Sequence, residues 1–175
     1  MKHLIPKLCI CFLALMVLAG CANESSPENV VVGNNAPDFA LPSLDGTTVK
    51  SNSLKGNVVV LNFWATWCQP CMGEIPELKE FAANSKAKVV SIALDQEGIK
   101  AVKPFVDSNA INYTVLLGDE EVFQRFNGLG IPYTLVLDQS QRIVKIYRGP
   151  ATKESLDADL KQIEQSVLIG ISGRN

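Results

Sequence analysis

The chain has 175 residues, of which 47% are hydrophobic and 19% charged, with a formal net charge of −2. This length and composition fit one globular domain with a short appendage. The slight excess of acidic residues provides no basic surface, which argues against nucleic acid as a partner.

The first 20 residues have the features of an export signal. Two lysines make a basic start, residues 8–18 are apolar but too few to span a bilayer, and Leu-Ala-Gly directly precedes Cys21. This ending resembles the bacterial lipobox, which implies that Cys21 is lipidated and becomes the first residue of the mature chain. An uncleaved membrane anchor is the alternative. Cleavage would leave 14 basic against 18 acidic residues and would remove the only histidine.

Residues 21–35 are predicted to be the lipid-bearing cysteine and a flexible tether, because they mix Ser, Asn, Glu, Pro and Gly. The folded domain is expected to cover residues 36–175. It opens with two short strand-like segments on either side of Asp45-Gly46, a pattern typical of a β-hairpin. A single helical turn is expected over residues 51–56.

The sequence VVVLNFW at residues 58–64 predicts the central buried strand, followed by a helix over residues 68–83. Cys68 and Cys71 stand where the strand passes into this helix. The first helical turn presents unpaired N–H groups and the positive end of the dipole, and both favour a thiolate. We therefore expect Cys68, near solvent, as the attacking thiolate and Cys71 as the shielded resolving thiol of a redox-active disulfide. Pro76 should kink the helix.

The cysteine pair has two other interpretations. A zinc site needs further Cys or His ligands, and the mature chain supplies none besides the lipid-bearing Cys21, so we expect no metal and no cofactor. Asp95, Asp119 and Glu120 are too far apart in sequence to indicate a metal site, and are interpreted as loop and helix-start acids. A purely structural disulfide stays open, because an oxidising compartment favours any cysteine pair.

The rest of the chain alternates predicted strands and helices, which indicates an α/β domain with a mixed sheet flanked by helices. Strands are expected over residues 89–94, 113–117, 133–137 and 143–147, the last two as an antiparallel hairpin. Helices are expected over residues 98–108, over 120–126 and from about residue 152, where one face carries Leu156, Leu160, Ile163 and Val167.

Several motifs resemble the thioredoxin fold: Trp-Cys-x-Pro-Cys at residues 67–71, Pro76, and Gly-Ile-Pro at 130–132 before a strand. The resemblance covers about residues 36–167. It is closest to the membrane-tethered thioredoxin-like proteins of the TlpA/ResA type, because of the Ala-Pro-Asp-Phe opening, the Asn-Phe-Trp sequence before the cysteines and the Glu-Ile-Pro sequence after them. An extra helix and strand at residues 98–117 match an insertion that this branch shares with the peroxiredoxins.

This resemblance implies a cis Ile131–Pro132 bond beside the cysteines, where the Ile131 backbone can pair with an extended substrate segment. On sequence alone Pro132 is a proline that enters a strand. The candidate substrate-binding residues are Trp67, Gln69, Pro70, Ile131 and Pro132, whereas Trp64 is expected in the core.

Asn62 and Glu74 mark a difference from thioredoxin itself. Thioredoxin has a buried carboxylate at the position of Asn62, which handles the proton of the second cysteine, and an amide cannot do this. Glu74 lies three residues after Cys71 on the same helical face, within reach of its thiol directly or through one water. In the TlpA/ResA type this glutamate is functional, which implies the same role for Glu74. A solvated glutamate near a helix start is the alternative.

We therefore expect an extracytoplasmic thiol-disulfide oxidoreductase, tethered to the periplasmic side of a membrane or to the cell surface. Gln-Pro stands between the cysteines in place of the histidine of strong oxidants. This favours a reductant with a potential nearer to that of thioredoxin, about −270 mV, than to that of DsbA, about −120 mV. The resemblance implies a transmembrane thiol carrier as electron donor and, in its best-known branch, an oxidised apocytochrome c as the substrate.

Two other functions stay open. A thiol peroxidase of the redoxin superfamily would have Pro and Thr seven and three residues before its reactive cysteine, where this chain has Leu61 and Ala65. A non-catalytic lipoprotein could use the same fold as a binding module.

Overall fold

The computed structural model describes residues 29–172. The predicted export signal, Cys21 and the first part of the predicted tether lie outside the described residues. Of the helices in the described part of the chain, none is both long and apolar enough to span a bilayer.

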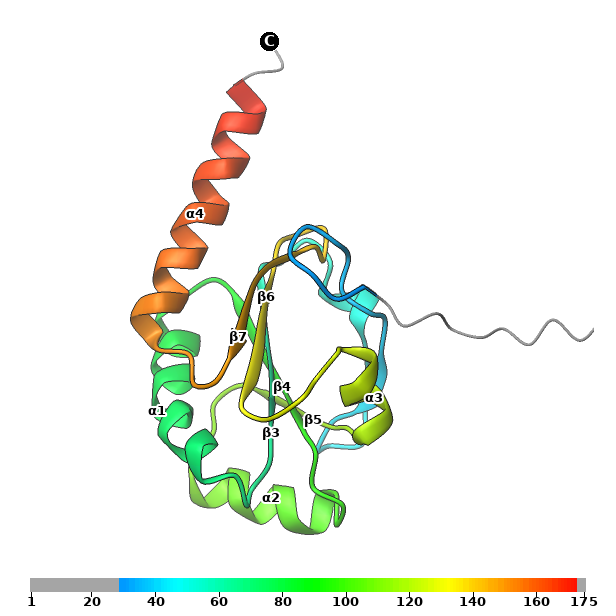
Figure 1. The fold of residues 1–175 in the computed structure, drawn as a ribbon. Coiled ribbons are helices and arrows are strands. Elements are labelled where there is room, and N and C mark those ends of the chain that lie inside the picture. The colour runs from blue at the N-terminus through cyan, green and yellow to red at the C-terminus, as the bar shows by residue number, and fades with distance from the viewer. Residues whose placement is uncertain (1–28, 173–175) are drawn as a thin grey trace, which may run out of the picture.

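A five-stranded mixed sheet with the strand order β5-β4-β3-β6-β7 forms the centre of the molecule (Figure 1). The parallel strands are β3 (Val59–Trp64), β4 (Lys88–Ala93) and β5 (Thr114–Leu117). β6 (Tyr133–Leu137) runs antiparallel to β3, and β7 (Ile143–Arg148) antiparallel to β6. The predicted α/β class and mixed sheet are confirmed, and β3 is central as expected.

Helices cover both faces of this sheet. α1 (Gln69–Asn84) and α4 (Lys153–Ser172) lie side by side on one face, and α2 (Ile99–Ser108) covers the same face near the start of α1 (Figure 1). α3 (Glu120–Arg125) covers the opposite face. Because side chains alternate along a strand, β3 sends Val60 toward Leu78 of α1, and Leu61 toward the core beneath α3.

The predicted hairpin is present as β1 (Ala40–Pro42) and β2 (Thr48–Lys50), which pair antiparallel. Gly46 has a φ of +86°, a backbone angle that suits glycine in this turn. A 3₁₀ turn, η1 (Ser51–Leu54), then leads to β3. Ser43 bridges Leu116, so the hairpin covers part of the edge strand β5.

The ordered body begins before residue 36, which corrects the predicted boundary between tether and domain. Val30 is only 3% exposed and belongs to the main hydrophobic core. The Gly33 N–H donates to the Ile143 carbonyl at 2.8 Å, and Asn35 pairs with Arg142. Composition alone predicted a tether here, but this segment satisfies backbone groups at the edge of β7.

The final helix extends further than its buried face. Leu156 and Ile163 are buried and Leu160 packs against them, as predicted, but Val167 is 42% exposed. Val167, on the same predicted face, is not covered because α4 continues past the end of the sheet (Figure 1).

Candidate functional site

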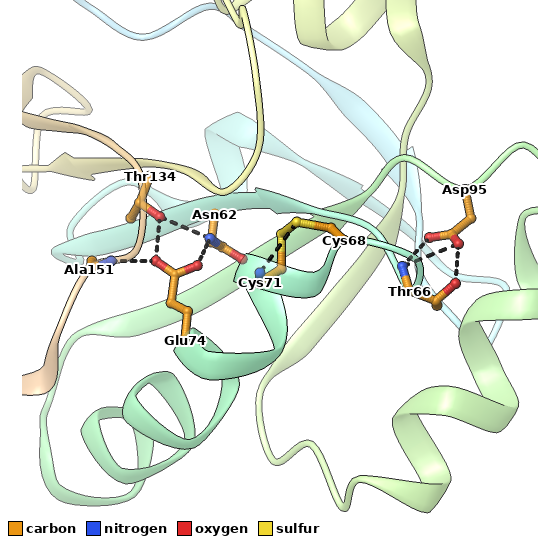
Figure 2. The surroundings of a disulfide bond; sticks show 8 residues. All are labelled: Asn62, Thr66, Cys68, Cys71, Glu74, Asp95, Thr134 and Ala151. Carbon is orange, nitrogen blue, oxygen red and sulfur yellow. Dashed lines mark hydrogen bonds between the residues drawn. A yellow bond between two sulfur atoms is a disulfide. The ribbon is translucent and has the colours of Figure 1, made fainter.

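Cys68 and Cys71 are joined by a disulfide at the beginning of α1, with their Cα atoms 5.3 Å apart (Figure 2). Cys68 is the N-cap residue of the helix, and the backbone N–H of Cys71 points to the Cys68 sulfur at 3.3 Å. This N–H and the helix start would stabilise negative charge on the Cys68 sulfur after reduction. Pro76 lies inside α1, as predicted.

Both cysteines are buried in this disulfide form. Cys68 is 4% exposed and Cys71 is 1% exposed, so the expectation that the Cys68 sulfur lies near solvent was wrong. The two cysteines belong to one buried cluster with Trp64, and Ile131 packs against this cluster. Trp64 is therefore a core residue, as expected.

The residues between and before the cysteines are open to solvent. Trp67 is 69% exposed, and Gln69 and Pro70 are exposed as well. These three predicted substrate-binding residues therefore surround the disulfide on the surface of the protein.

The Ile131–Pro132 peptide bond is cis, as the resemblance implied. Ile131 is half-buried and packs against the cluster that contains both cysteines, while Pro132 is buried. The loop that precedes β6 and the start of α1 therefore meet at the disulfide, although 60 residues of chain separate Cys71 from Ile131.

Asp95 holds the loop before Cys68 in place. Its carboxylate accepts from the Thr66 N–H at 3.1 and 3.2 Å and from the Thr66 hydroxyl, and Asp95 is only 4% exposed (Figure 2). The sequence predicted only a loop acid here. A signal for this role exists, because Asp95 follows closely on β4, at the edge where parallel strands end.

Over residues 29–172, no three His, Cys, Asp or Glu side chains are arranged to hold a metal ion.

Glu74 is buried beneath the disulfide, 1% exposed, so the alternative of a solvated glutamate was wrong. Its Oε1 accepts from the Ala151 N–H at 2.8 Å and from the Thr134 hydroxyl at 3.3 Å. Its Oε2 accepts from the Asn62 amide at 2.9 Å. Figure 2 shows these groups converging on the carboxyl from three different elements of the chain.

Burial raises the pKa of Glu74 above its ordinary value of 4.5, because desolvation disfavours the charged form. The donors Ala151, Asn62 and Thr134 oppose this shift without cancelling it. A carboxyl whose pKa lies nearer to neutral is better matched to exchanging a proton with a thiol than an ordinary glutamate is.

A row of polar side chains crosses the centre of the sheet below Glu74. In the strand register Asn62 on β3 pairs with Ser91 on β4 and with Thr134 on β6, and all three are buried. The Asn62 amide also donates to the Thr134 hydroxyl at 2.9 Å, and in Figure 2 it lies between Glu74 and the disulfide. Sequence reasoning found Asn62 but missed Thr134, although a polar residue in an apolar strand was a usable signal.

The backbone N–H of Ala151 gave no sequence signal, because it comes from the loop between β7 and α4. Only the packing of α4 beside α1 brings this N–H to Glu74.

Comparison with known proteins agrees with this geometry. The model of the AhpC/TSA family matches residues 32–146. The chain is 31% identical over 161 residues to the thiol-disulfide oxidoreductase ResA of Bacillus cereus, a match that covers 86% of this chain and 93% of that protein. It is 33% identical over 132 residues to the thioredoxin-like protein YneN of Bacillus subtilis, covering 73% of this chain and 78% of that protein.

A solved structure shares the fold. The thiol:disulfide interchange protein of the thioredoxin family from Chlorobium tepidum superposes with a TM-score of 0.66 at 32% identity, covering 74% of this chain and 95% of that chain. The predicted thioredoxin fold is therefore confirmed.

Proposed function

The chain belongs to the AhpC/TSA family and is a thiol-disulfide oxidoreductase, and from this premise we propose that it is a membrane-tethered reductant of protein disulfides outside the cytoplasm. The observation that carries the proposal is the Cys68–Cys71 disulfide at a helix start with the buried Glu74 carboxyl beneath it. A thiol peroxidase is not supported, because Leu61 and Ala65 occupy the positions where its Pro and Thr would stand.

The first step is attack by Cys68. In the reduced protein the Cys68 thiolate, stabilised by the Cys71 N–H, attacks one sulfur of a substrate disulfide. A bond forms between Cys68 and that sulfur, and the second substrate sulfur leaves as a thiolate and takes a proton from water. The substrate backbone pairs with Ile131 beside the cis bond, in the manner of an added strand.

The second step is resolution by Cys71. The Cys71 thiol gives its proton to Glu74 through one water, and its thiolate attacks the Cys68 sulfur. The Cys71–Cys68 bond forms as the bond between Cys68 and the substrate breaks, and the substrate sulfur leaves as a thiolate that takes a proton from water. The substrate leaves fully reduced, and the protein holds the disulfide that this structure contains. Two electrons have passed to the substrate, and a thiol donor must reduce the protein again.

The direction of electron flow is tested by the reduction potential. We expect a value near that of thioredoxin, about −270 mV, because no histidine stands between the cysteines to stabilise the reduced form. Equilibration with a series of glutathione or dithiothreitol buffers, read by alkylation and mass, gives this potential. A value near that of DsbA, about −120 mV, would reverse the assignment to an oxidant.

The tether to the membrane is proposed from the sequence Leu-Ala-Gly before Cys21. In a bacterial host, the wild-type chain should incorporate labelled palmitate and sediment with membranes, whereas the Cys21→Ala variant should incorporate none. Label that persists in Cys21→Ala would refute lipidation at this residue.

The electron donor and the substrate are proposed from the reductant role and from the resemblance to proteins of the TlpA/ResA type. A reductant outside the cytoplasm needs electrons from across the membrane, which favours a transmembrane thiol carrier as donor. An oxidised apocytochrome c is the proposed substrate.

A further inference from the structure

Two hollows of opposite charge adjoin the loop before β6, and both are lined by Gly130 and Ile131. The larger, of about 740 Å³, extends from Trp67 to the beginning of α3. The smaller, of about 310 Å³, lies between Leu129, Pro132 and Arg148. A substrate strand that pairs with Ile131 therefore lies next to both hollows.

The larger hollow, named here the acidic hollow, is lined by four carboxylates and by no basic residue: Asp95, Glu97, Asp119 and Glu120. The Asp95 carboxylate accepts from Thr66, and the Asp119 carboxylate caps α3 by accepting from the Val122 N–H at 2.9 Å. Glu120 accepts from the Gln124 amide at 2.9 Å, but Glu97, Asp119 and Glu120 are all exposed. In the part of the chain that the structure describes, none of these three forms an ion pair. Their charge is thus available to a ligand.

The smaller hollow, named here the basic hollow, contains one charged residue, Arg148. Its guanidinium lies 5.0 Å from the centre of the Tyr133 ring and donates to the Asn127 carbonyl at 3.4 Å. These contacts hold the exposed guanidinium at the rim, where it is free of any acidic partner among residues 29–172.

An extended substrate fits this arrangement in a defined way. Side chains two residues apart point to the same face of a strand and lie about 7 Å apart. If the reactive cysteine of the substrate faces Cys68, the residues two before and two after it face the same way, one toward each hollow.

We propose that these hollows select protein disulfides by the order of charges around the reactive cysteine. A basic side chain two residues away on one side enters the acidic hollow, and an acidic side chain two residues away on the other side meets Arg148. The reversed order places like charges together at both hollows. This inference rests on the proposed role of the site as a disulfide reductant.

The size of the preference follows from the exposure of these charges. A solvent-exposed ion pair is worth up to about fivefold in affinity, and replacement of attraction by repulsion at two positions should multiply to about tenfold. The preference should shrink at 1 M salt, because screening shortens the range of such interactions to about 3 Å.

Four disulfide-linked peptide homodimers test the proposal, with the patterns Lys-x-Cys-x-Glu, Glu-x-Cys-x-Lys, Lys-x-Cys-x-Lys and Glu-x-Cys-x-Glu. Attack by Cys68 on either sulfur links one peptide to the protein and releases the other as a thiol, and dithiothreitol in excess supplies the two electrons for each cycle. One of the two mixed orders should have a kcat/KM about tenfold above the other. Equal values for the two orders would overturn the proposal.

Charge-neutralising variants then assign the preference to residues. Arg148→Gln should remove the preference for an acidic over a basic side chain at the peptide position that meets Arg148. The double variant Glu97→Gln and Glu120→Gln should remove the preference for a basic side chain at the other position. The matched controls are Lys145→Gln, an exposed cation on the same strand, and Glu121→Gln, an exposed acid beside Glu120 but outside the acidic hollow. If the control variants reduce the charge preference as much as the test variants do, the proposal is also overturned.

The outcomes separate this inference from the proposed function. If the wild-type protein reduces all four peptides at one rate and Cys68→Ser reduces none, the reductant role stands and the charge selection fails. If the wild-type protein and Cys68→Ser are equally inactive toward every peptide, the proposed function fails.

Discussion

Replacement of Cys68 by serine is expected to abolish disulfide reduction, with a loss in kcat/KM of at least about a thousandfold. A serine hydroxyl has nearly the same shape but is not ionised at neutral pH, so the attack on the substrate sulfur has no nucleophile. The measurement is turnover of a protein disulfide such as insulin with dithiothreitol as electron source. As a control for folding, the unfolding of the wild-type protein and of Cys68→Ser is compared in reductant. Neither protein then contains the Cys68–Cys71 disulfide, so a difference in stability cannot be due to its loss.

Cys71→Ala is the informative companion to this variant. Because the nucleophile Cys68 remains, the first step should proceed once and leave the substrate bound covalently to Cys68. In cells, the protein trapped on this variant identifies the substrate, and an apocytochrome c is expected. Sustained turnover by Cys68→Ser, or a failure of Cys71→Ala to accumulate any mixed disulfide, would contradict the assigned order of the two cysteines.

Glu74→Gln should slow the release of reduced substrate by about a hundredfold at neutral pH, because no base remains to take the Cys71 proton. The side-chain oxygen of glutamine can still accept from the Ala151 N–H, so the loop that leads into α4 should stay in place. The deficit should shrink as the pH rises, because hydroxide can then take the Cys71 proton in place of Glu74. Stopped-flow measurement of mixed-disulfide decay across pH tests this, and a wild-type profile in the variant would remove Glu74 from the mechanism.

The same substitution should change how stability depends on pH. The folded-state pKa of Glu74 is raised above 4.5, so the unfolded chain loses this proton at a lower pH than the folded protein does. Between the two pKa values the folded state holds the extra proton, and the free energy of unfolding falls as pH rises through this window. Glu74→Gln should remove that fall in denaturant titrations. Glu80→Gln, at an exposed position of the same helix, is the control that should keep it.

Much of the fold could be predicted because its signals are local. The apolar run of residues 58–64 has the composition of a strand buried on both faces, and β3 lies at the centre of the sheet. The hairpin follows from Asp45-Gly46, whose glycine adopts the positive φ that the turn requires. The expectation of a tether at residues 29–35 failed, and helical periodicity did not show where the buried part of α4 ends, because neither composition nor periodicity reveals where the edge of a sheet lies.

The functional site also has a part that the sequence predicts and a part that only the fold determines. Cys68, Cys71 and Glu74 share one helix, so their spacing in sequence already fixed which of them could meet. The burial of Glu74 could not be derived from this spacing, because its three donors come from β3, β6 and the loop before α4. The surroundings of Cys68 likewise depend on residues distant in sequence, because β4, α2 and the Ile131 loop contribute to the cluster around it.

The sequence by itself determined the chemistry: two cysteines at a helix start, an acid one turn beyond them, and an α/β order of elements around them. Only the tertiary structure decided the environment of that chemistry, namely a buried glutamate with a raised pKa, a loop held by Asp95, and hollows of opposite charge beside the cis bond. The physical reason is that a pKa and a binding surface depend on desolvation and on charges that segments distant in sequence bring together, whereas strand and helix formation depends mainly on neighbouring residues.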